Sequence, residues 1–204
     1  MFAVVESGSI VSMPRGNKGI QIGDMKYSSD IFTTKWTEAE RNAIGVYTVE
    51  IDETNKKNEE YYVNTNITYS YDSSANKVKG VYGSATAKAM ADSDAVDEDG
   101  NKLKDENGNQ VIIEGLKTIK KRIINNECKG LLEPSDWMVV KATETGTTMD
   151  SGWKTWRASV RTKCNSMQTQ IDNAADIDAL AALFTYTIKD GVQSRPLGEF
   201  PVKE

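Results

Sequence analysis

Two arginines and two tryptophans lie close together in the sequence and have the chemistry to bind an anionic group. Trp153 and Trp156 are three residues apart, and Arg157 and Arg161 are four apart, so on a helix they are neighbours. A guanidinium donates paired hydrogen bonds to a carboxylate or a phosphate, which makes an anchor for a partner chain one interpretation. In the alternative, the arginine stems cover the tryptophan rings, and the charged ends meet solvent or an aspartate of the same chain. We favour the alternative, because it is the ordinary behaviour of surface arginines.

The sequence offers little for catalysis. Histidine is absent, and histidine is the usual general base and the commonest metal ligand near neutral pH. This excludes Ser-His-Asp and Cys-His hydrolases and histidine-based zinc sites, and leaves carboxylate or lysine chemistry. Ser84 precedes Lys88 by four residues, one more than a Ser-x-x-Lys arrangement allows, and no glycine-rich phosphate loop occurs. We therefore predict that the chain is not an enzyme, with no catalytic residues, no metal ligands and no cofactor.

An acidic stretch in the middle of the chain nearly repeats itself. Asp97-Glu-Asp-Gly-Asn101 is followed by Asp105-Glu-Asn-Gly-Asn109. Asp-Gly and Asn-Gly are the strongest turn dipeptides, so we interpret residues 92–109 as a protruding β-hairpin or loop. A calcium loop is the alternative, because four aspartates crowd oxygen ligands together, although the EF-hand order is not matched. These are Asp92, Asp94, Asp97 and Asp99.

The composition is that of a folded protein with a modest core. Hydrophobic residues make up 38% and charged residues 27%, and the formal net charge of −5 argues against a nucleic-acid footprint. Cys128 and Cys164 fall at apolar positions of predicted helices, so we expect small core hydrophobes rather than a disulfide. The apolar runs are far shorter than the roughly 20 residues of a membrane span. The first residues lack the pattern of a secretory signal.

Residues 1–82 predict a small antiparallel β domain with one short helical insertion. A hairpin is expected where Phe2–Val5 and Ile10–Met13 flank Glu-Ser-Gly-Ser. The inserted helix begins at Thr37, with Glu40 completing a capping box, and ends at Gly45. Alternating apolar residues indicate the other strands. We expect them at 19–23, 46–51, 60–63, 67–71 and 77–82.

Residues 113–190 predict a helical domain. One helix runs from Leu116 and stops before Pro134. A longer helix begins at Asp150, and Asp176 caps a third, which should lie antiparallel to the second as a helical hairpin. The apolar stripe of the first helix is Leu116, Ile119, Ile123, Cys128 and Leu131, and that of the second is Trp153, Trp156, Val160, Cys164, Met167, Ile171 and Ala174.

Two further segments complete an α+β chain. Residues 83–112 are predicted as an acidic, turn-rich hairpin or linker, with a weak helix signal at 83–91. Residues 191–204 contain two prolines and predict an extended C-terminal arm. Trp137–Val140 is a short apolar run, either a strand or a link into the next turn.

One order of motifs points to a family. Leu131-Leu-Glu-Pro-Ser-Asp-Trp137 is followed by Glu-Thr-Gly at 144–146 and by Trp153-x-x-Trp156-Arg157-x-x-Val160-Arg161. This order resembles the tail assembly chaperones and tail-fibre-associated proteins of bacteriophages, which tend to show a leucine and Asp-Trp turn and then a Trp-x-x-Tyr-Arg-x-x-Leu-Arg helix. Here Trp156 stands for the usual tyrosine and Val160 for the usual leucine. Residues 21–47 are also similar to a segment common in phage tail accessory proteins.

The resemblance leaves out the acidic hairpin and implies a context rather than a reaction. It implies a structural or adaptor subunit of a phage tail, at the baseplate or fibre attachment, made in the host cytoplasm and found in the virion. Such a subunit docks with other tail proteins and occurs in several copies in a symmetric assembly. The residues expected to face partners are Trp137, Trp153, Trp156, Arg157, Arg161 and Phe200.

Two alternatives to a virion component stay open. The first is an assembly chaperone that is absent from the mature particle. The second is a carboxylate-dependent glycan hydrolase of the tail. Such an enzyme needs two carboxyl groups about 5 to 9.5 Å apart in a cleft.

Overall fold

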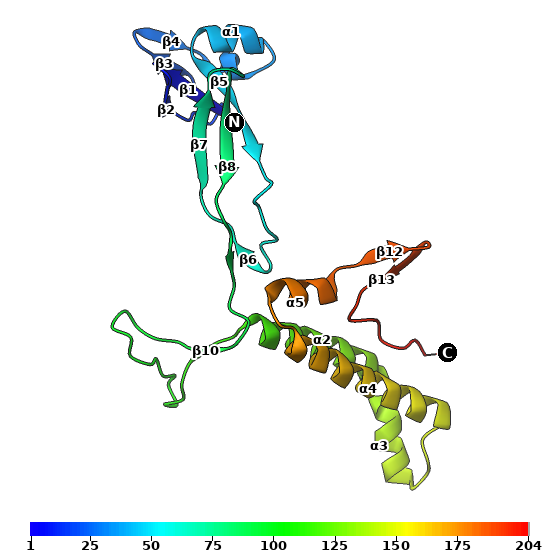
Figure 1. Ribbon diagram of the computed structural model, residues 1–204. Helices are drawn as coiled ribbons and strands as arrows, with labels where there is room; N and C mark the ends of the chain where they lie inside the picture. Colours follow the sequence, from blue (N-terminus) through cyan, green and yellow to red (C-terminus); the bar gives the residue numbers. More distant parts are fainter. Residues whose placement is uncertain (204) are drawn as a thin grey trace. The chain divides into compact units, whose positions relative to one another are not determined.

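The computed structural model describes residues 1–203, and the chain divides into two compact units (Figure 1). The first, Met1–Thr86, consists mostly of β-strands, and the second, Ala87–Glu204, contains the long helices. The α+β class predicted from the sequence, with N-terminal sheets and C-terminal helices, is confirmed. Most of the predicted turn-rich linker, residues 87–112, and the predicted C-terminal arm fall within the second unit.

The first unit is built on a five-stranded sheet in the order β2-β1-β5-β8-β7. Its neighbouring strands are antiparallel except β5 and β8, which run parallel, so the prediction of an antiparallel sheet is wrong for this pair. Residues 53–66 leave β5 and return at the same end of the sheet. The chain then runs down β7 and back up β8, and β8 lies beside β5. The strands are β1 (Phe2–Glu6), β2 (Ser9–Ser12), β5 (Val46–Asp52), β7 (Ile67–Asp72) and β8 (Lys77–Tyr82).

Both faces of this sheet are covered. Successive side chains of a strand point to opposite faces, and on β1 Ala3 and Val5 join one buried cluster while Val4 joins the other. The second cluster is closed by short elements around Ile31, and the Tyr27 and Trp36 rings meet edge to face within it. These elements are β3 (Ile20–Ile22), β4 (Met25–Tyr27), the 3-10 helix η1 (Ser29–Phe32) and α1 (Glu38–Ala43).

The predicted start and end of α1 are confirmed. Thr37 and Glu40 form the capping box, with the Glu40 carboxylate accepting from the Thr37 amide at 2.7 Å. Gly45 follows the helix with a φ of 79°, and a Cβ there would lie 2.7 Å from the Val5 carbonyl oxygen. Only glycine fits this position, because the backbone is left-handed and another strand passes so closely.

The second unit contains four α-helices, one more than the sequence predicted. Trp137–Val140 lies in α3, so the expectation of a strand or a link is wrong. Pro134 does stop α2, but it also lies in the first turn of the 3-10 helix η2, a position that suits proline, and α3 continues from there. The helices are α2 (Leu116–Leu132), η2 (Glu133–Ser135), α3 (Asp136–Thr145), α4 (Ser151–Asn173) and α5 (Ile177–Phe184).

Helix α4 packs chiefly on α2. The stripe predicted for α4 is confirmed from Val160 to Ala174. The stripe predicted for α2 is wrong in its middle and at its end. Ile124 and Lys120 are buried, while Ile123 is 40% exposed and Leu131 is 37% exposed. This core includes a cation–π contact, because Lys120 Nζ lies 4.3 Å from the centre of the Phe184 ring. The antiparallel packing of α4 and α5 as a helical hairpin stays a prediction.

The shorter strands lie at the edges of these units. Residues 83–91 are not helical and include a two-residue strand, so the helix signal there is wrong. The two strands after α5 form an antiparallel hairpin with every residue exposed. The remaining strands are β6 (Tyr62–Val63), β9 (Thr86–Ala87), β10 (Ser93–Asp94), β11 (Ile112–Ile113), β12 (Thr187–Lys189) and β13 (Val192–Ser194).

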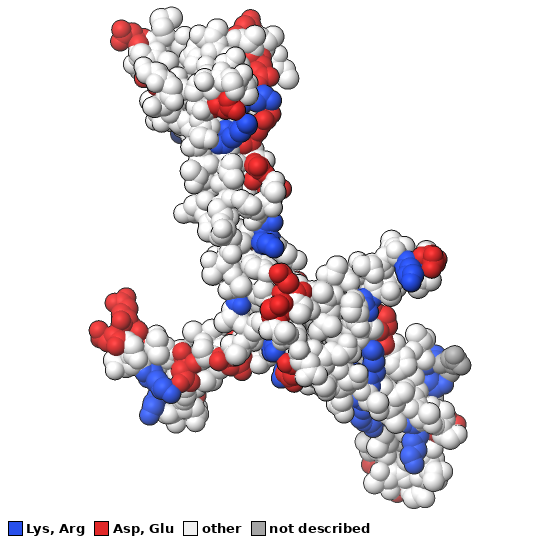
Figure 2. All heavy atoms as spheres, viewed as in Figure 1, with Lys and Arg blue, Asp and Glu red and all other residues white. Residues whose placement is uncertain are grey.

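The acidic stretch folds as turns within a hairpin, as predicted. Strands β10 and β11 pair antiparallel at its base, and two turns follow each other between them. The turns make the same bonds: the carboxylates of Asp97 and Asp105 each accept from the amides two and four residues further on. Acidic side chains gather over this hairpin in Figure 2. Within residues 1–203, no group of three or more Cys, Asp or Glu side chains is placed to hold a metal ion.

No helix among residues 1–203 is both long enough and apolar enough to cross a membrane.

Candidate functional site

Arg157 is buried at the joint between α4 and the η2–α3 segment. Its guanidinium donates to the Leu132 carbonyl oxygen at 2.7 Å and to Ser135 Oγ at 2.5 Å. It also forms an ion pair with Asp136 at 2.6 Å. The favoured interpretation of the sequence allowed an aspartate of the same chain as the partner of this arginine. Asp136 is that partner. Three acceptors hold the start of α3 against α4, so Arg157 positions the surface that α3 presents.

The tryptophan pair binds the C-terminal segment of the same chain. Trp153 and Trp156 meet edge to face, with ring centres 5.5 Å apart. Trp156 Nε1 donates to the Pro201 carbonyl oxygen at 2.9 Å, and Lys203 Nζ lies 5.4 Å from the Trp153 ring centre. Both rings are half-buried, so they anchor the predicted arm rather than stand open on the surface.

The arm is fixed further by Leu197, a residue to which the sequence analysis gave no role. Leu197 is fully buried, and its amide donates to the Leu183 carbonyl oxygen at 3.1 Å. Its own carbonyl oxygen accepts from Lys163 Nζ at 2.9 Å. Phe200, expected to face a partner, is half-buried within this arm. An isolated leucine between a proline and a glycine carries no periodic signal, which is why the sequence did not reveal this anchor.

Helix α3 has no buried residue. It is also apolar: Trp137 is 57% exposed and Val140 55%. Large apolar side chains that cluster on an exposed face mark an interaction surface. Of the six residues predicted to face partners, the structure leaves two exposed, Trp137 and Arg161.

A groove runs between α3 and the start of α4, and we call it the α3–α4 groove. Two adjoining hollows of about 400 and 550 Å³ form it, and they share Ala142 and residues 147–149. Trp137 lines one hollow, and the exposed Arg161 lines the other. Three further cations border the groove, and one of them, Arg157, is paired with Asp136. The other two are Lys141 and Lys154.

The two cysteines line a separate hollow of about 430 Å³ between α2 and α4. Both are free and buried, as expected for core residues. Burial, and next a hydrogen bond with Cys164, raise the pKa of the Cys128 thiol to about 11. Because the thiolate is the reactive form, this environment makes Cys128 unreactive at neutral pH.

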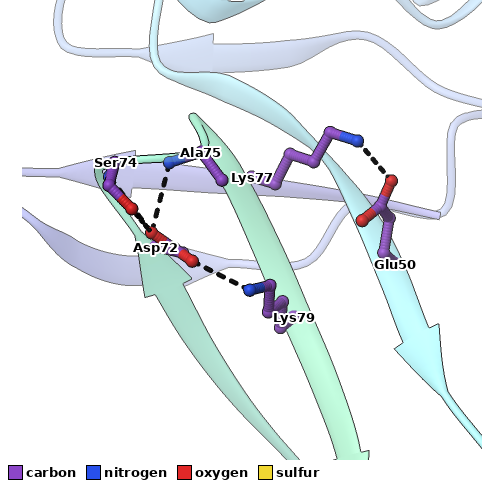
Figure 3. A network of polar contacts seen from close by, with 6 residues as sticks. All are labelled: Glu50, Asp72, Ser74, Ala75, Lys77 and Lys79. Carbon is purple, nitrogen blue, oxygen red and sulfur yellow. Dashed lines mark hydrogen bonds and ion pairs between the residues drawn. The ribbon is translucent and has the colours of Figure 1, made fainter.

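The first unit carries its own polar network on the β7–β8 hairpin (Figure 3). Asp72 accepts from Ser74 Oγ at 2.6 Å and from Lys79 Nζ at 2.9 Å. Lys77 forms an ion pair with Glu50 of β5 at 2.5 Å. Ser74 and Lys77 have the Ser-x-x-Lys spacing, which was missed in the sequence, but each side chain is bonded to a different carboxylate. The network therefore acts to fix a turn and to join β8 to β5.

The carboxylates are sparse in the three hollows described above. The hollow lined by Arg161 and Val139 contains none, and the other two contain one each, Asp150 and Asp136. The Asp150 carboxylate accepts from the Trp153 amide at 3.1 Å and caps α4. None of these three hollows has the pair of carboxyl groups that a glycan hydrolase uses.

Comparisons of the chain with protein-family models, with curated proteins and with solved structures found no match. The functional argument therefore depends on the exposed surface and on the contacts described above.

Proposed function

We propose that the chain is a structural or adaptor subunit that acts by docking against other protein chains. The observation that carries this proposal is the amount of exposed surface, 13545 Å². Two compact domains with the masses of the two units would expose about 11,400 Å² together. The chain thus exposes about 2,000 Å² more than two folded domains need, which is roughly twice the area of about 800 Å² that one partner contributes to a standard protein interface.

Much of this surface belongs to elements with no core of their own. The β12–β13 hairpin exposes Ile188 to 76%, and a two-stranded hairpin is only marginally stable alone in water. The acidic hairpin exposes Ile112 and Ile113, and α3 exposes Trp137 and Val140. A partner that covers these side chains would stabilise the elements that carry them, which is the behaviour expected of a subunit in an assembly.

The context that we propose is the tail of a bacteriophage, at the baseplate or fibre attachment, on the basis of the motif order described above. In this proposal α4 and α5 form a helical hairpin that supports α3, and α3 faces the neighbouring protein in the virion. An assembly chaperone would use the same surfaces but would leave before the particle is complete.

Peptide mass spectrometry on gradient-purified phage particles tests the proposal and separates it from the chaperone. We expect the chain at a fixed ratio to the tail tube protein. Detection in the lysate, but never in the particle, would contradict a virion component and favour the chaperone.

A further inference from the structure

The negative charge of the chain is concentrated in one hairpin. Residues 92–114 contain eight acidic side chains and two lysines, a net charge of −6, while the whole chain carries −5. The rest of the chain therefore sums to +1. One protruding element thus carries the acidic character of the whole molecule, an asymmetry that favours binding to a basic surface.

Five of the eight acidic side chains lie at the two turns of this hairpin. Hydrogen bonds from the amides of Asn101 and Asn109 hold the pKa values of Asp97 and Asp105 below their ordinary range, so both carboxylates stay charged. Three more carboxylates on the same turns are exposed. They are Glu98, Asp99 and Glu106. Apolar side chains flank the turns, since Val96 and Leu103 are about half exposed. A surface that binds this hairpin must therefore be both basic and apolar.

The α3–α4 groove has this chemistry. In one of its two hollows Lys154 and Arg161 are the cations and Val139 is an apolar lining residue, and in the other Lys141 is the cation and Trp137 is an apolar lining residue. Its single aspartate is occupied as the cap of α4. The exposed part of the groove is therefore net positive and apolar, complementary to the turns of the hairpin.

The hairpin and the groove lie at opposite ends of α2. The hairpin leads directly into Leu116 at the start of this helix, and the groove begins beyond Leu132 at its end. A helix of 17 residues is about 25 Å long. This separation favours docking between two copies over docking within one chain.

We propose that the acidic hairpin of one copy docks in the α3–α4 groove of a second copy. The inference rests on the proposed docking function and names the first partner, a copy of this chain. The contact joins two different surfaces, so each copy keeps one hairpin and one groove available for the next. Such a head-to-tail contact builds a ring where the rotation closes and a filament where it does not.

Two variants of the full chain test the contact. In the groove variant, Lys154→Glu is combined with Arg161→Glu. In the hairpin variant, Glu98→Gln, Asp99→Asn and Glu106→Gln are combined. A matched control, Lys18→Glu with Lys26→Glu, makes the same charge change as the groove variant but in the first unit. Circular dichroism checks that all three variants fold.

Sedimentation velocity over a range of protein concentrations gives the outcome. We expect the natural chain and the control to form oligomers at low salt that dissociate as salt is raised, because exposed charges are screened. Each variant alone should be monomeric. Mixed in equal amounts, the two variants should form a heterodimer that grows no further, because its one intact hairpin and its one intact groove are already docked with each other and only the altered surfaces are left free.

A natural chain that is monomeric throughout, oligomers that both variants retain, or variants that fail to form the heterodimer would each overturn the inference. These results are distinguishable from failure of the proposed function. A monomeric chain found at a fixed ratio in phage particles would overturn the head-to-tail contact alone. A heterodimer of a chain that is absent from particles would support the contact and contradict the virion subunit.

Discussion

At the scale of the residue, Arg157 shows how a charge is used inside this protein. Burying a guanidinium is costly unless its donors are satisfied. Here the Leu132 carbonyl, Ser135 Oγ and the Asp136 carboxylate accept from it, while its buried Nε has no hydrogen-bond partner among the described residues. The Arg157 side chain is 8% exposed and that of Asp136 is 60% exposed, so solvent screens the ion pair on the aspartate side. Its role is to fix the joint from which α3 projects.

Replacement of Arg157 should therefore destabilise the helical unit. We expect Arg157→Ala to lower the free energy of unfolding by about 2 to 4 kcal/mol, because it removes a buried side chain together with its three hydrogen bonds. Arg161→Ala is the matched control, since Arg161 is exposed and its one described bond is to the Arg157 carbonyl oxygen. For Arg161→Ala we expect the free energy of unfolding to change by no more than about 0.5 kcal/mol. Urea unfolding followed by circular dichroism at 222 nm measures both, and equal effects would contradict the role given to Arg157.

Asp72 gives a prediction on pH dependence. Hydrogen bonds from Ser74, and next from Lys79, hold the pKa of its carboxyl well below the ordinary value of 3.8. A lowered pKa in the folded chain means that the ionised form is the one stabilised. Its contribution is fully present above pH 3.8 and is lost as the pH falls through the folded pKa. The β7–β8 turn should thus stay closed in mild acid and open only below that range.

Carboxyl chemical shifts measured by NMR through an acid titration test this. We expect Asp72 to titrate well below pH 3.8, and Ser74→Ala to bring its pKa back towards that value. Ser73→Ala, one residue earlier, serves as the control and should change little. A titration of Asp72 at its ordinary value in the natural chain would disprove the network in Figure 3.

At the scale of the element, the C-terminal segment depends on one side chain. Leu197 is fully buried in a turn of this segment, and its backbone is bonded to Leu183 and Lys163. We expect Leu197→Ala to release the segment, because truncating a buried leucine costs about 2 to 5 kcal/mol. Val202→Ala, at a side chain that is 86% exposed, is the control.

Hydrogen exchange measured by mass spectrometry on peptides covering 195–203 reports the result. Exchange should rise sharply in Leu197→Ala and stay unchanged in Val202→Ala. Unchanged exchange in both variants would mean that the Trp156–Pro201 bond and the other contacts suffice without Leu197.

The same elements show what the sequence can predict. Thr37, Glu40 and Gly45 define α1 through local chemistry, and the stripe of α4 follows from periodicity, so both were predicted. Burial of Lys120 was not, because it depends on the Phe184 ring, far away in the chain. Helix α3 was missed since Pro134 is a stop signal locally, while the Arg157 bonds that hold the next helix are tertiary contacts. The parallel pairing of β5 with β8 was missed for the same reason. Alternation of apolar and polar residues predicts a strand, but it does not predict the order of the strands in the sheet.

The candidate site was likewise predicted only in part from the sequence. The motif around Trp153 and Arg157 identified residues that matter for the structure, but Arg157 and Trp156 contact their own chain. The exposure of Trp137 depends on how η2 turns the chain into α3, which no pattern in the sequence specifies. Partner residues and core residues are alike in type here, because both are large, apolar or cationic. Only the fold separates them.

At the scale of the whole molecule, the chain exposes more surface than its two units require, and three of its elements present apolar side chains on that surface. This surplus of exposed surface explains why the hydrophobic core is modest for a chain of 204 residues. The account predicts that partner chains complete this surface, with α3 at the centre of the contact.

Hydroxyl-radical footprinting tests this claim most directly. The chain would be labelled in the complex from which it is isolated under native conditions, and again as the purified chain alone, with the oxidation of each peptide measured by mass spectrometry. The account predicts strong protection of Trp137 and Val140 in the complex, with Met25, exposed on the first unit, as a reference for labelling. Equal labelling of Trp137 and Val140 in the two samples would contradict it.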